Sequence, residues 1–263
     1  MTFIDQMQRR VELNGVPRRI ISLVPSQTEL LADLGLEQEV VGITKFCIHP
    51  AAWFQQKSRV GGTKTLNFNK IEALKPDLII GNKEENEREQ IEFLSERYPV
   101  WMSDVKTLED ALEMIRAVGL ITGKGAEAEQ MATEIAARFE RIPLNDNPLS
   151  AVYLIWRKPF IGVGRDTFID DMLRRAGFKN ALSGYERYPQ LTPEQLTEIN
   201  PQVILLSSEP YPFSEKNFAE LREICPDAVL KVVDGELFSW YGSRLLEFGM
   251  RSAECGIWRS AGH

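Results

Sequence analysis

The chain has 263 residues, of which 43% are hydrophobic and 26% are charged, and its formal net charge is −7. These values are typical of a globular protein with a substantial core, and the acidic balance argues against nucleic acid or an anionic membrane as partner. No apolar run reaches the roughly 18 residues that suggest a membrane-spanning helix. The start, MTFIDQMQRR, lacks the apolar core of a signal peptide.

Strand and helix patterns alternate through the first half of the chain. Residues 3–13 predict a short two-stranded lead-in, and Asn14-Gly15 marks a turn. Residues 19–24 are β-branched and apolar, which is typical of a strand buried on both faces of a parallel sheet. Ser26 and Glu29 match an S-x-x-E capping box at the start of the next helix, and Gly35 is expected to end that helix.

Further elements of the first half follow in order. The pattern predicts a strand at 40–43, an exit loop at 44–50, a polar loop at 51–68, a helix at 69–74, a strand at 77–81, a loop at 82–86, a helix at 87–97, a strand at 100–102 and a helix from Thr107 to 120.

The second half repeats this order. It predicts a strand at 151–156, a glycine loop at 161–165, a helix at 167–176, a helix opened by the capping box Thr192–Gln195, a strand at 203–206, a helix at 214–223, a strand at 228–234 and a helix at 244–257. Residues 71–80 recur in class and spacing as residues 196–205, at an offset of 125 positions, which indicates a weak internal repeat.

The fold expected is therefore α/β, with two lobes of parallel-sheet βα units. We expect an N-terminal lobe at 1–122, a single long connector helix within 123–143 (uninterrupted from Gly125 to Ile142) and a C-terminal lobe at 144–263. Ligands of open α/β sheets bind beyond the carboxyl ends of the strands. The predicted ligand cleft accordingly lies between the lobes, among their strand-end loops.

Several residues are candidates for contact with that ligand. His49 could bind it, and could serve as an axial ligand to cobalt or iron, or it could be a loop histidine bonded to backbone. Cys47 is expected to pack inward. Three cysteines without a C-x-x-C pair favour free thiols, and two histidines, His49 and His263, are too few for a bare transition-metal site.

Other candidates come from loops, and each has a structural alternative. Asn82, Lys83 and Glu84 either line the cleft or form a solvated charged face. Trp240 and Tyr241 are predicted to be exposed for stacking on a flat macrocycle, with core packing as the alternative. The same prediction and the same alternative apply to Tyr188. Arg165 and Arg244 could meet propionate or amide groups, or form surface salt bridges. Lys64, in the stretch Gly61–Thr65, completes the candidate set.

Motifs for catalysis are missing from the sequence. Gly162-x-Gly164 lacks the remainder of a phosphate-binding loop, and there is no G-x-S-x-G or H-E-x-x-H. Beyond scattered carboxylates, the sequence offers no support for catalysis.

The order of several short motifs resembles one family. These motifs are Phe3, Asp5, Arg9 and Val11 of the lead-in, 17–23, Pro25-Ser26-x-Thr28-Glu29, 74–78, Phe168–Asp171 with Ala176-Gly177, and Asn200-Pro201. Together they resemble the substrate-binding proteins of ABC importers in the helical-backbone metal-receptor superfamily. Residues 41–44, the loop ending at Pro50, and Tyr188–Gln190 are most similar to cobalamin-binding members.

The resemblance implies a binding protein rather than an enzyme, one that requires no cofactor, binds a corrinoid and serves uptake or salvage. Haem or an iron–siderophore is the alternative ligand, and a cytoplasmic enzyme acting on a corrinoid is the alternative function. It further implies a monomer that docks on an ABC permease through one surface glutamate per lobe. Glu194 matches the second position, whereas the first falls on Asn69, with Glu72 one turn later. Localisation is expected to be periplasmic if a leader was trimmed and cytoplasmic if the chain starts natively as given.

The chain also departs from the family pattern in its cleft segments. His49 replaces an aromatic residue that usually precedes the proline, and the stretch Gly-Gly-Thr-Lys-Thr at 61–65 lacks an aromatic residue that is often found near Thr63.

Overall fold

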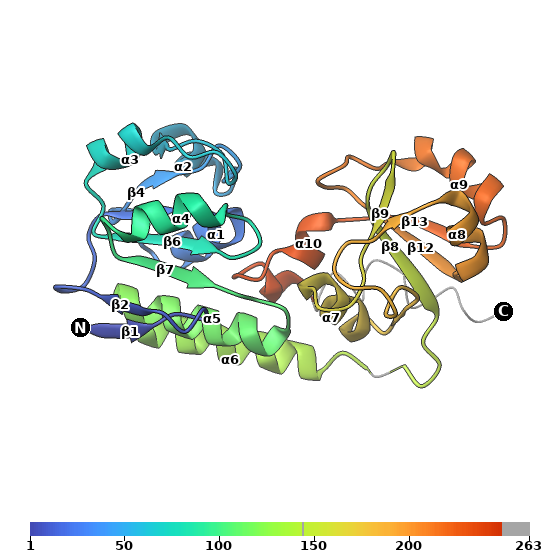
Figure 1. Cartoon of the computed structure of the whole chain (residues 1–263). Helices are drawn as coiled ribbons and strands as arrows, with labels where there is room; N and C mark the ends of the chain where they lie inside the picture. Colours follow the sequence, from blue (N-terminus) through green and yellow to red (C-terminus); the bar gives the residue numbers. More distant parts are fainter. Residues whose placement is uncertain (144, 249–263) are drawn as a thin grey trace. The chain divides into compact units, whose positions relative to one another are not determined.

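The computed structural model describes residues 1–143 and 145–248, which form two compact units (Figure 1). The first unit comprises Met1–Val105, Glu109–Ala136 and Trp240–Leu245. The second comprises Lys106–Leu108, Ala137–Ser239 and the described residues from Leu246 onward. The sequence-based bounds place Trp240–Leu245 in the C-terminal lobe, whereas the contacts group this segment with the first unit.

A five-stranded parallel sheet forms the centre of the first unit, in the order β5-β4-β3-β6-β7. Its strands are β3 (Ile20–Ser22), β4 (Val40–Ile43), β5 (Ser58–Arg59), β6 (Leu78–Asn82) and β7 (Val100–Ser103). The helices α1 (Pro25–Asp33), α2 (Ala51–Gln56), α3 (Phe68–Leu74) and α4 (Arg88–Ser95) connect them. All residues of the central strand β3 are buried, as its apolar sequence predicts.

The predicted two-stranded lead-in is confirmed, because β1 (Thr2–Ile4) and β2 (Arg10–Glu12) pair as an antiparallel hairpin. The Asp5 carboxylate stabilises the turn between them by accepting hydrogen bonds from the backbone N–H of Met7 and Arg9. One local prediction for the first unit is wrong, since the segment 51–68 contains α2 and β5 rather than a loop alone.

Helices α5 (Leu108–Thr122) and α6 (Gly125–Glu140) complete the first unit and run side by side (Figure 1). Gly119 on α5 permits their close approach, because an added Cβ would lie 2.1 Å from the Cβ of Ala128. The predicted connector helix is α6, which passes from the first unit to the second after Ala136 and ends at Glu140, two residues before the predicted Ile142.

A mixed sheet forms the second unit, in the order β11-β9-β8-β12-β13, with β10 also paired to β8. The strands are β8 (Ser150–Trp156), β9 (Phe160–Gly162), β10 (Lys179–Asn180), β11 (Gln190–Leu191), β12 (Val203–Ser207) and β13 (Val229–Val233). Strands β8, β12 and β13 are parallel, as predicted. Three short strands were not predicted: β10 pairs parallel with β8, β9 pairs antiparallel with β8, and β11 pairs antiparallel with β9. Only three residues separate β8 from β9, too few for a parallel crossover, so part of the predicted glycine loop is a hairpin strand.

The second sheet packs against short helices around an apolar core. The helices are α7 (Phe168–Arg175), α8 (Pro193–Ile199), the 3₁₀ helix η1 (Glu215–Asn217), α9 (Phe218–Ile224) and α10 (Gly235–Ser239). Strands β8 and β12 contribute Val152, Leu154, Ile204 and Leu206 to this core, all fully buried. Most of the predicted helix 244–257 lies outside the described residues, which end at 248. Within the described part of the chain, no helix is both long and apolar enough to cross a bilayer.

The weak sequence repeat corresponds to a structural repeat. Helix α3 and strand β6 of the first unit match α8 and β12 of the second at an offset of 125 positions throughout. Both helices have seven residues and end at a left-handed cap with φ 45° and ψ 60°, at Lys75 and at Asn200, each followed by proline. The two units therefore share one βα building block.

The matched caps allow a stability prediction. Lysine adopts the left-handed conformation at an energetic cost, whereas asparagine tolerates it better and glycine accepts it freely. Lys75→Gly is therefore expected to raise the free energy of unfolding by about 0.5–1 kcal/mol, after allowance for the greater freedom of glycine in the unfolded chain. Asn200→Gly should give less than half of this gain. Urea unfolding of both variants checks the difference, and a loss of stability in Lys75→Gly would contradict it.

Candidate functional site

The carboxyl edge of the first sheet carries the exit loop 44–50, which follows β4. Cys47 anchors this loop: its thiol is fully buried and lies 3.1 Å from the hydroxyl oxygens of both Thr28 and Thr44. Burial raises the pKa of the Cys47 thiol, while the hydrogen bonds with the two threonines oppose that rise. Cys47 thus packs inward, as predicted, and both Cys47 and Cys225 are free thiols.

The residues on either side of Cys47 face outward. Phe46 is 50% exposed and Ile48 is 46% exposed, while His49 is half-buried. Gly62 makes room for the Phe46 ring, since a Cβ there would lie 3.2 Å from a ring carbon. The sequence analysis missed Phe46 and Ile48. The pattern Phe46-Cys47-Ile48 could have indicated them, because two large apolar residues flank a small one that was expected to pack inward.

Trp240 and Tyr241 are 7% and 5% exposed, so the prediction that they are exposed is wrong. They are buried because Trp240–Leu245 packs against the first unit, with Gly242 allowing close contact: an added Cβ would lie 2.6 Å from the carbonyl oxygen of Ser26. The Trp240 ring meets the His49 ring edge-on, with centroids 5.6 Å apart and planes at 69°. The structure thus brings together two predicted site residues that are 191 positions apart (240 − 49).

Arg244 forms a bidentate ion pair with Glu29 of α1. Its Nε lies 3.0 Å from Oε2 and its Nη2 lies 2.6 Å from Oε1, while the side chains are only 10% and 18% exposed. Burial raises the pKa of Glu29, although Arg244 acts in the opposite direction through its hydrogen bond and charge. The surface salt bridge considered for Arg244 is in fact a largely buried one.

Glu29 is consequently not a capping residue. Helix α1 begins at Pro25, its N-cap is Val24, and no side chain caps it. The hydroxyl of Ser26 is buried without a hydrogen-bond partner. The capping box predicted at Ser26 is therefore wrong, whereas the one at Thr192 and Gln195 is confirmed.

Hydrogen bonds of the buried Asn82 side chain stabilise the loop after β6. Asn82 is 1% exposed, donates to the Ser103 hydroxyl at 2.9 Å and accepts from the backbone N–H of Glu84 and Glu85. Lys83 pairs with Asp104 at 2.5 Å. Asn82 thus shapes the loop and presents no amide at the surface.

Lys64 approaches the same loop. Its ammonium group donates to the carbonyl oxygen of Glu84 at 2.8 Å and lies 3.4 Å from a carboxylate oxygen of Glu87. The side chain of Lys64 is 54% exposed. Of the loop candidates, Lys64, Lys83 and the half-buried Glu84 reach the surface.

In the second unit, Arg165 and Tyr188 belong to two neighbouring segments. Arg165 is exposed and pairs with Glu186, while its backbone N–H donates to the carbonyl oxygen of Tyr185. Tyr188 is 36% exposed and Tyr185 is 39% exposed. Gly164 is required for this contact, because an added Cβ would lie 2.4 Å from the carbonyl oxygen of Tyr185. Tyr185 is a second exposed aromatic residue that the sequence analysis missed.

The two docking candidates are exposed residues of the repeated helices: Glu72 on α3 and Glu194 on α8. Hydrogen bonding to Thr192 lowers the pKa of Glu194. The structural repeat pairs Glu194 with Asn69 (194 − 125), in the second position of α3.

Among residues 1–143 and 145–248, no group of three or more His, Cys, Asp or Glu side chains is placed to hold a metal ion. His263 and Cys255 lie outside the described residues. His49 therefore remains the one metal candidate from the sequence, as a single axial ligand.

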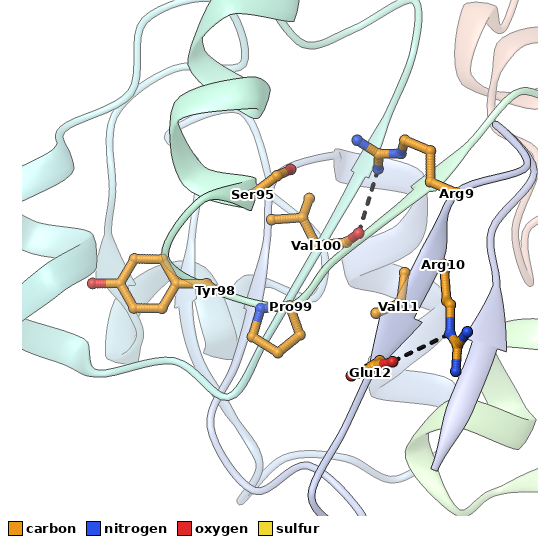
Figure 2. Close-up of a pocket in the computed structure, with 8 residues that line it drawn as sticks. All are labelled: Arg9, Arg10, Val11, Glu12, Ser95, Tyr98, Pro99 and Val100. Carbon is orange, nitrogen blue, oxygen red and sulfur yellow. Dashed lines mark hydrogen bonds and ion pairs between the residues drawn. The ribbon is translucent and has the colours of Figure 1, made fainter.

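A separate cavity of about 450 Å³ opens beside β2, α4 and β7 in the first unit, and Figure 2 shows its lining. It holds none of the predicted site residues. Its arginines are already engaged by the chain itself. Arg9 donates to the carbonyl oxygen of Val100 and Arg10 pairs with Glu12 (Figure 2). Arg9 also pairs with Asp5. The cavity offers no uncompensated charge for a ligand.

Comparisons with known proteins find similarity to periplasmic and substrate-binding proteins. A family model described as periplasmic binding protein matches residues 20–225. An uncharacterized ABC transporter substrate-binding lipoprotein of Bacillus subtilis is 26% identical over 216 residues, which cover 78% of this chain and 68% of that protein. A vitamin B12-binding protein of Pectobacterium carotovorum is 26% identical over 240 residues, which cover 88% and 86% respectively.

The solved structure of a periplasmic haem-binding protein of Vibrio cholerae has the same fold. Its TM-score is 0.78 at 19% identity, and the match covers 91% of this chain and 98% of that one.

Proposed function

We propose that this chain, which belongs to the periplasmic binding protein family, binds a corrinoid through the exit loop 44–50 of its first unit. The chain is a substrate-binding protein, not an enzyme. The observation that carries the proposal is the pair of large apolar side chains, Phe46 and Ile48, half exposed at the carboxyl edge of a parallel sheet. Exposed apolar groups at that edge suit a large, flat ligand.

His49 and the loop after β6 add polar character to this surface. The imidazole could coordinate the metal of a tetrapyrrole, as neutral histidine does. Lys64 and Lys83 lie nearby on the sheet's carboxyl edge and could donate to amide or carboxylate groups of the ligand. In the second unit, Tyr185, Tyr188 and Arg165 would form the corresponding ligand surface.

The choice of a corrinoid follows the vitamin B12-binding relative, which is similar over 88% of this chain. Haem is the second candidate, because the chain shares its fold with a haem-binding protein and carries His49 in the loop. An iron–siderophore would be handled by the same surface without imidazole coordination.

The transport role extends this proposal. The lipoprotein relative is a component of an ABC transporter, and we expect this chain to act outside the cytoplasmic membrane and deliver its ligand to a permease. Glu194 and Glu72 are the expected docking residues, and the delivering form is expected to be a monomer.

Titration of the protein with cyanocobalamin, dicyanocobinamide, haemin and ferrichrome tests the proposal. Calorimetry should give micromolar or tighter binding for a corrinoid and weaker binding for the other ligands. Tight binding of haemin alone would favour the haem alternative, and binding of none of the four would overturn the proposal. Turnover of a bound corrinoid would contradict the assignment as a non-catalytic binder.

His49→Ala isolates the axial contact. If the imidazole coordinates the metal, the variant changes the visible spectrum of the bound aquocobalamin or haem, whereas an unchanged spectrum and affinity exclude coordination by His49.

A further inference from the structure

The segment Trp240–Leu245 is far from the first unit in sequence but belongs to it in structure. Two features hold it there. Gly242 lies against the carbonyl oxygen of Ser26, in a space that no Cβ could occupy, and Arg244 forms the bidentate pair with Glu29. Both contacts attach the segment to α1.

Glu29, Arg244, Trp240 and His49 form a continuous series of contacts, which begins with the ion pair of Glu29 and Arg244. The guanidinium carbon of Arg244 lies 4.7 Å from the centroid of the Trp240 ring, and the edge-on contact of Trp240 with His49 continues the series. Since Trp240 is 7% exposed, it offers little surface to a ligand. Its ring instead supports the imidazole from the protein interior.

Stability alone does not explain this arrangement. Removing two charges from water costs free energy that a buried ion pair often fails to recover, so apolar replacements of similar volume are often neutral or stabilising. The hydroxyls of Ser26 and Ser243 are also buried without hydrogen-bond partners, and burial of each such group is unfavourable. A role in positioning the side chains of the site would explain why these charged and polar groups are buried despite the unfavourable free energy.

We propose that Glu29 is a positioning residue of the ligand site: through Arg244 and Trp240 it fixes the orientation of the His49 imidazole. Glu29 itself does not contact the ligand. This inference rests on the proposed function for its effect on binding, but the orientation of His49 can be measured without any ligand.

The main test is the double substitution Glu29→Leu with Arg244→Met, which replaces the ion pair by apolar groups. Its urea unfolding midpoint should equal or exceed that of the wild type. Its affinity for aquocobalamin, whose axial water is exchangeable, should nevertheless fall at least about tenfold, because small misplacements of a contact group are costly. A purely structural role would make affinity follow stability, so wild-type affinity in a stable double variant would overturn the proposal.

A ligand-free readout separates this inference from the proposed function. The chain has two histidines, so the His49 ring protons can be assigned by NMR with a His49→Ala reference. The Trp240 ring current should shift these resonances in the wild type, and the shift should diminish in the double variant. Unchanged His49 resonances would overturn the positioning role, whichever ligand binds.

Two further variants complete the test. Gly242→Ala acts on the same segment without removing a charge and should reduce both the His49 shift and the affinity. Arg116→Met with Glu129→Leu removes an exposed ion pair of the same unit, whose Nε and Oε2 lie 2.7 Å apart, and should alter neither. An equal effect of this control would show that the loss is nonspecific and would contradict the proposal.

Discussion

Phe46→Ser is expected to weaken binding of dicyanocobinamide about ten- to a hundredfold while leaving the unfolding midpoint nearly unchanged. The Phe46 ring is 50% exposed in the free protein, so a ligand would bury about 100 Å² of apolar surface there, worth roughly 2.5 kcal/mol at about 25 cal/mol per Å². Part of this gain is offset on binding by ordering of the loop. Calorimetry of the variant and wild type measures the difference.

Phe93→Ser provides the matched control. Phe93 is 40% exposed in the same unit, but it lies on α4 and contacts Phe68 and Arg97 rather than the exit loop. This variant should keep wild-type affinity. Equal affinities of Phe46→Ser and wild type would exclude the exit loop as the contact surface, even if a corrinoid binds.

Gly119→Ala is expected to lower the free energy of unfolding by about 1–3 kcal/mol, as overpacking does. Helix propensity alone predicts a gain of about 1 kcal/mol from this change. Crowding outweighs that gain, because the new Cβ would lie 2.1 Å from the Ala128 Cβ and 2.9 Å from the carbonyl oxygen of Lys124, where α5 turns into α6. Urea unfolding followed by circular dichroism measures the loss.

Two variants test the steric explanation. Gly125→Ala lies at the start of α6 with nothing within 4 Å of the new Cβ and should not destabilise the protein. Ala128→Gly added to Gly119→Ala removes the closest contact and should restore part of the stability. If Gly119→Ala is as stable as wild type, the close approach of α5 and α6 is not required for the fold.

Much of the fold was predictable because it depends on contacts between residues close in sequence. The Thr192 and Gln195 capping box, the glycine that ends α1 and the matched helix ends before Pro76 and Pro201 are local features. The buried parallel strands were likewise evident as apolar runs. The hairpin β8–β9 was missed because two glycines in β9 and its exit concealed a strand within a loop-like composition.

Site prediction was less complete, because exposure depends on which surfaces meet. His49, Trp240 and Arg244 were chosen by residue type, and the structure brings them together in the first unit. Trp240 was expected at the surface, since no periodicity indicates that its loop packs on α1. Phe46 was overlooked because its exposure follows from the inward anchoring of Cys47.

The sequence by itself determined the α/β class, the repeated βα unit, the long helix after Gly125 and the resemblance to binding proteins, since these depend on local spacing. Only the tertiary structure decided the role of Glu29. The pattern Ser26-x-x-Glu29 is a capping box by local criteria, yet Arg244, 215 residues later, takes the carboxylate instead. A bidentate contact with a buried guanidinium outweighs one backbone hydrogen bond, and no local pattern reveals a partner so distant in the chain.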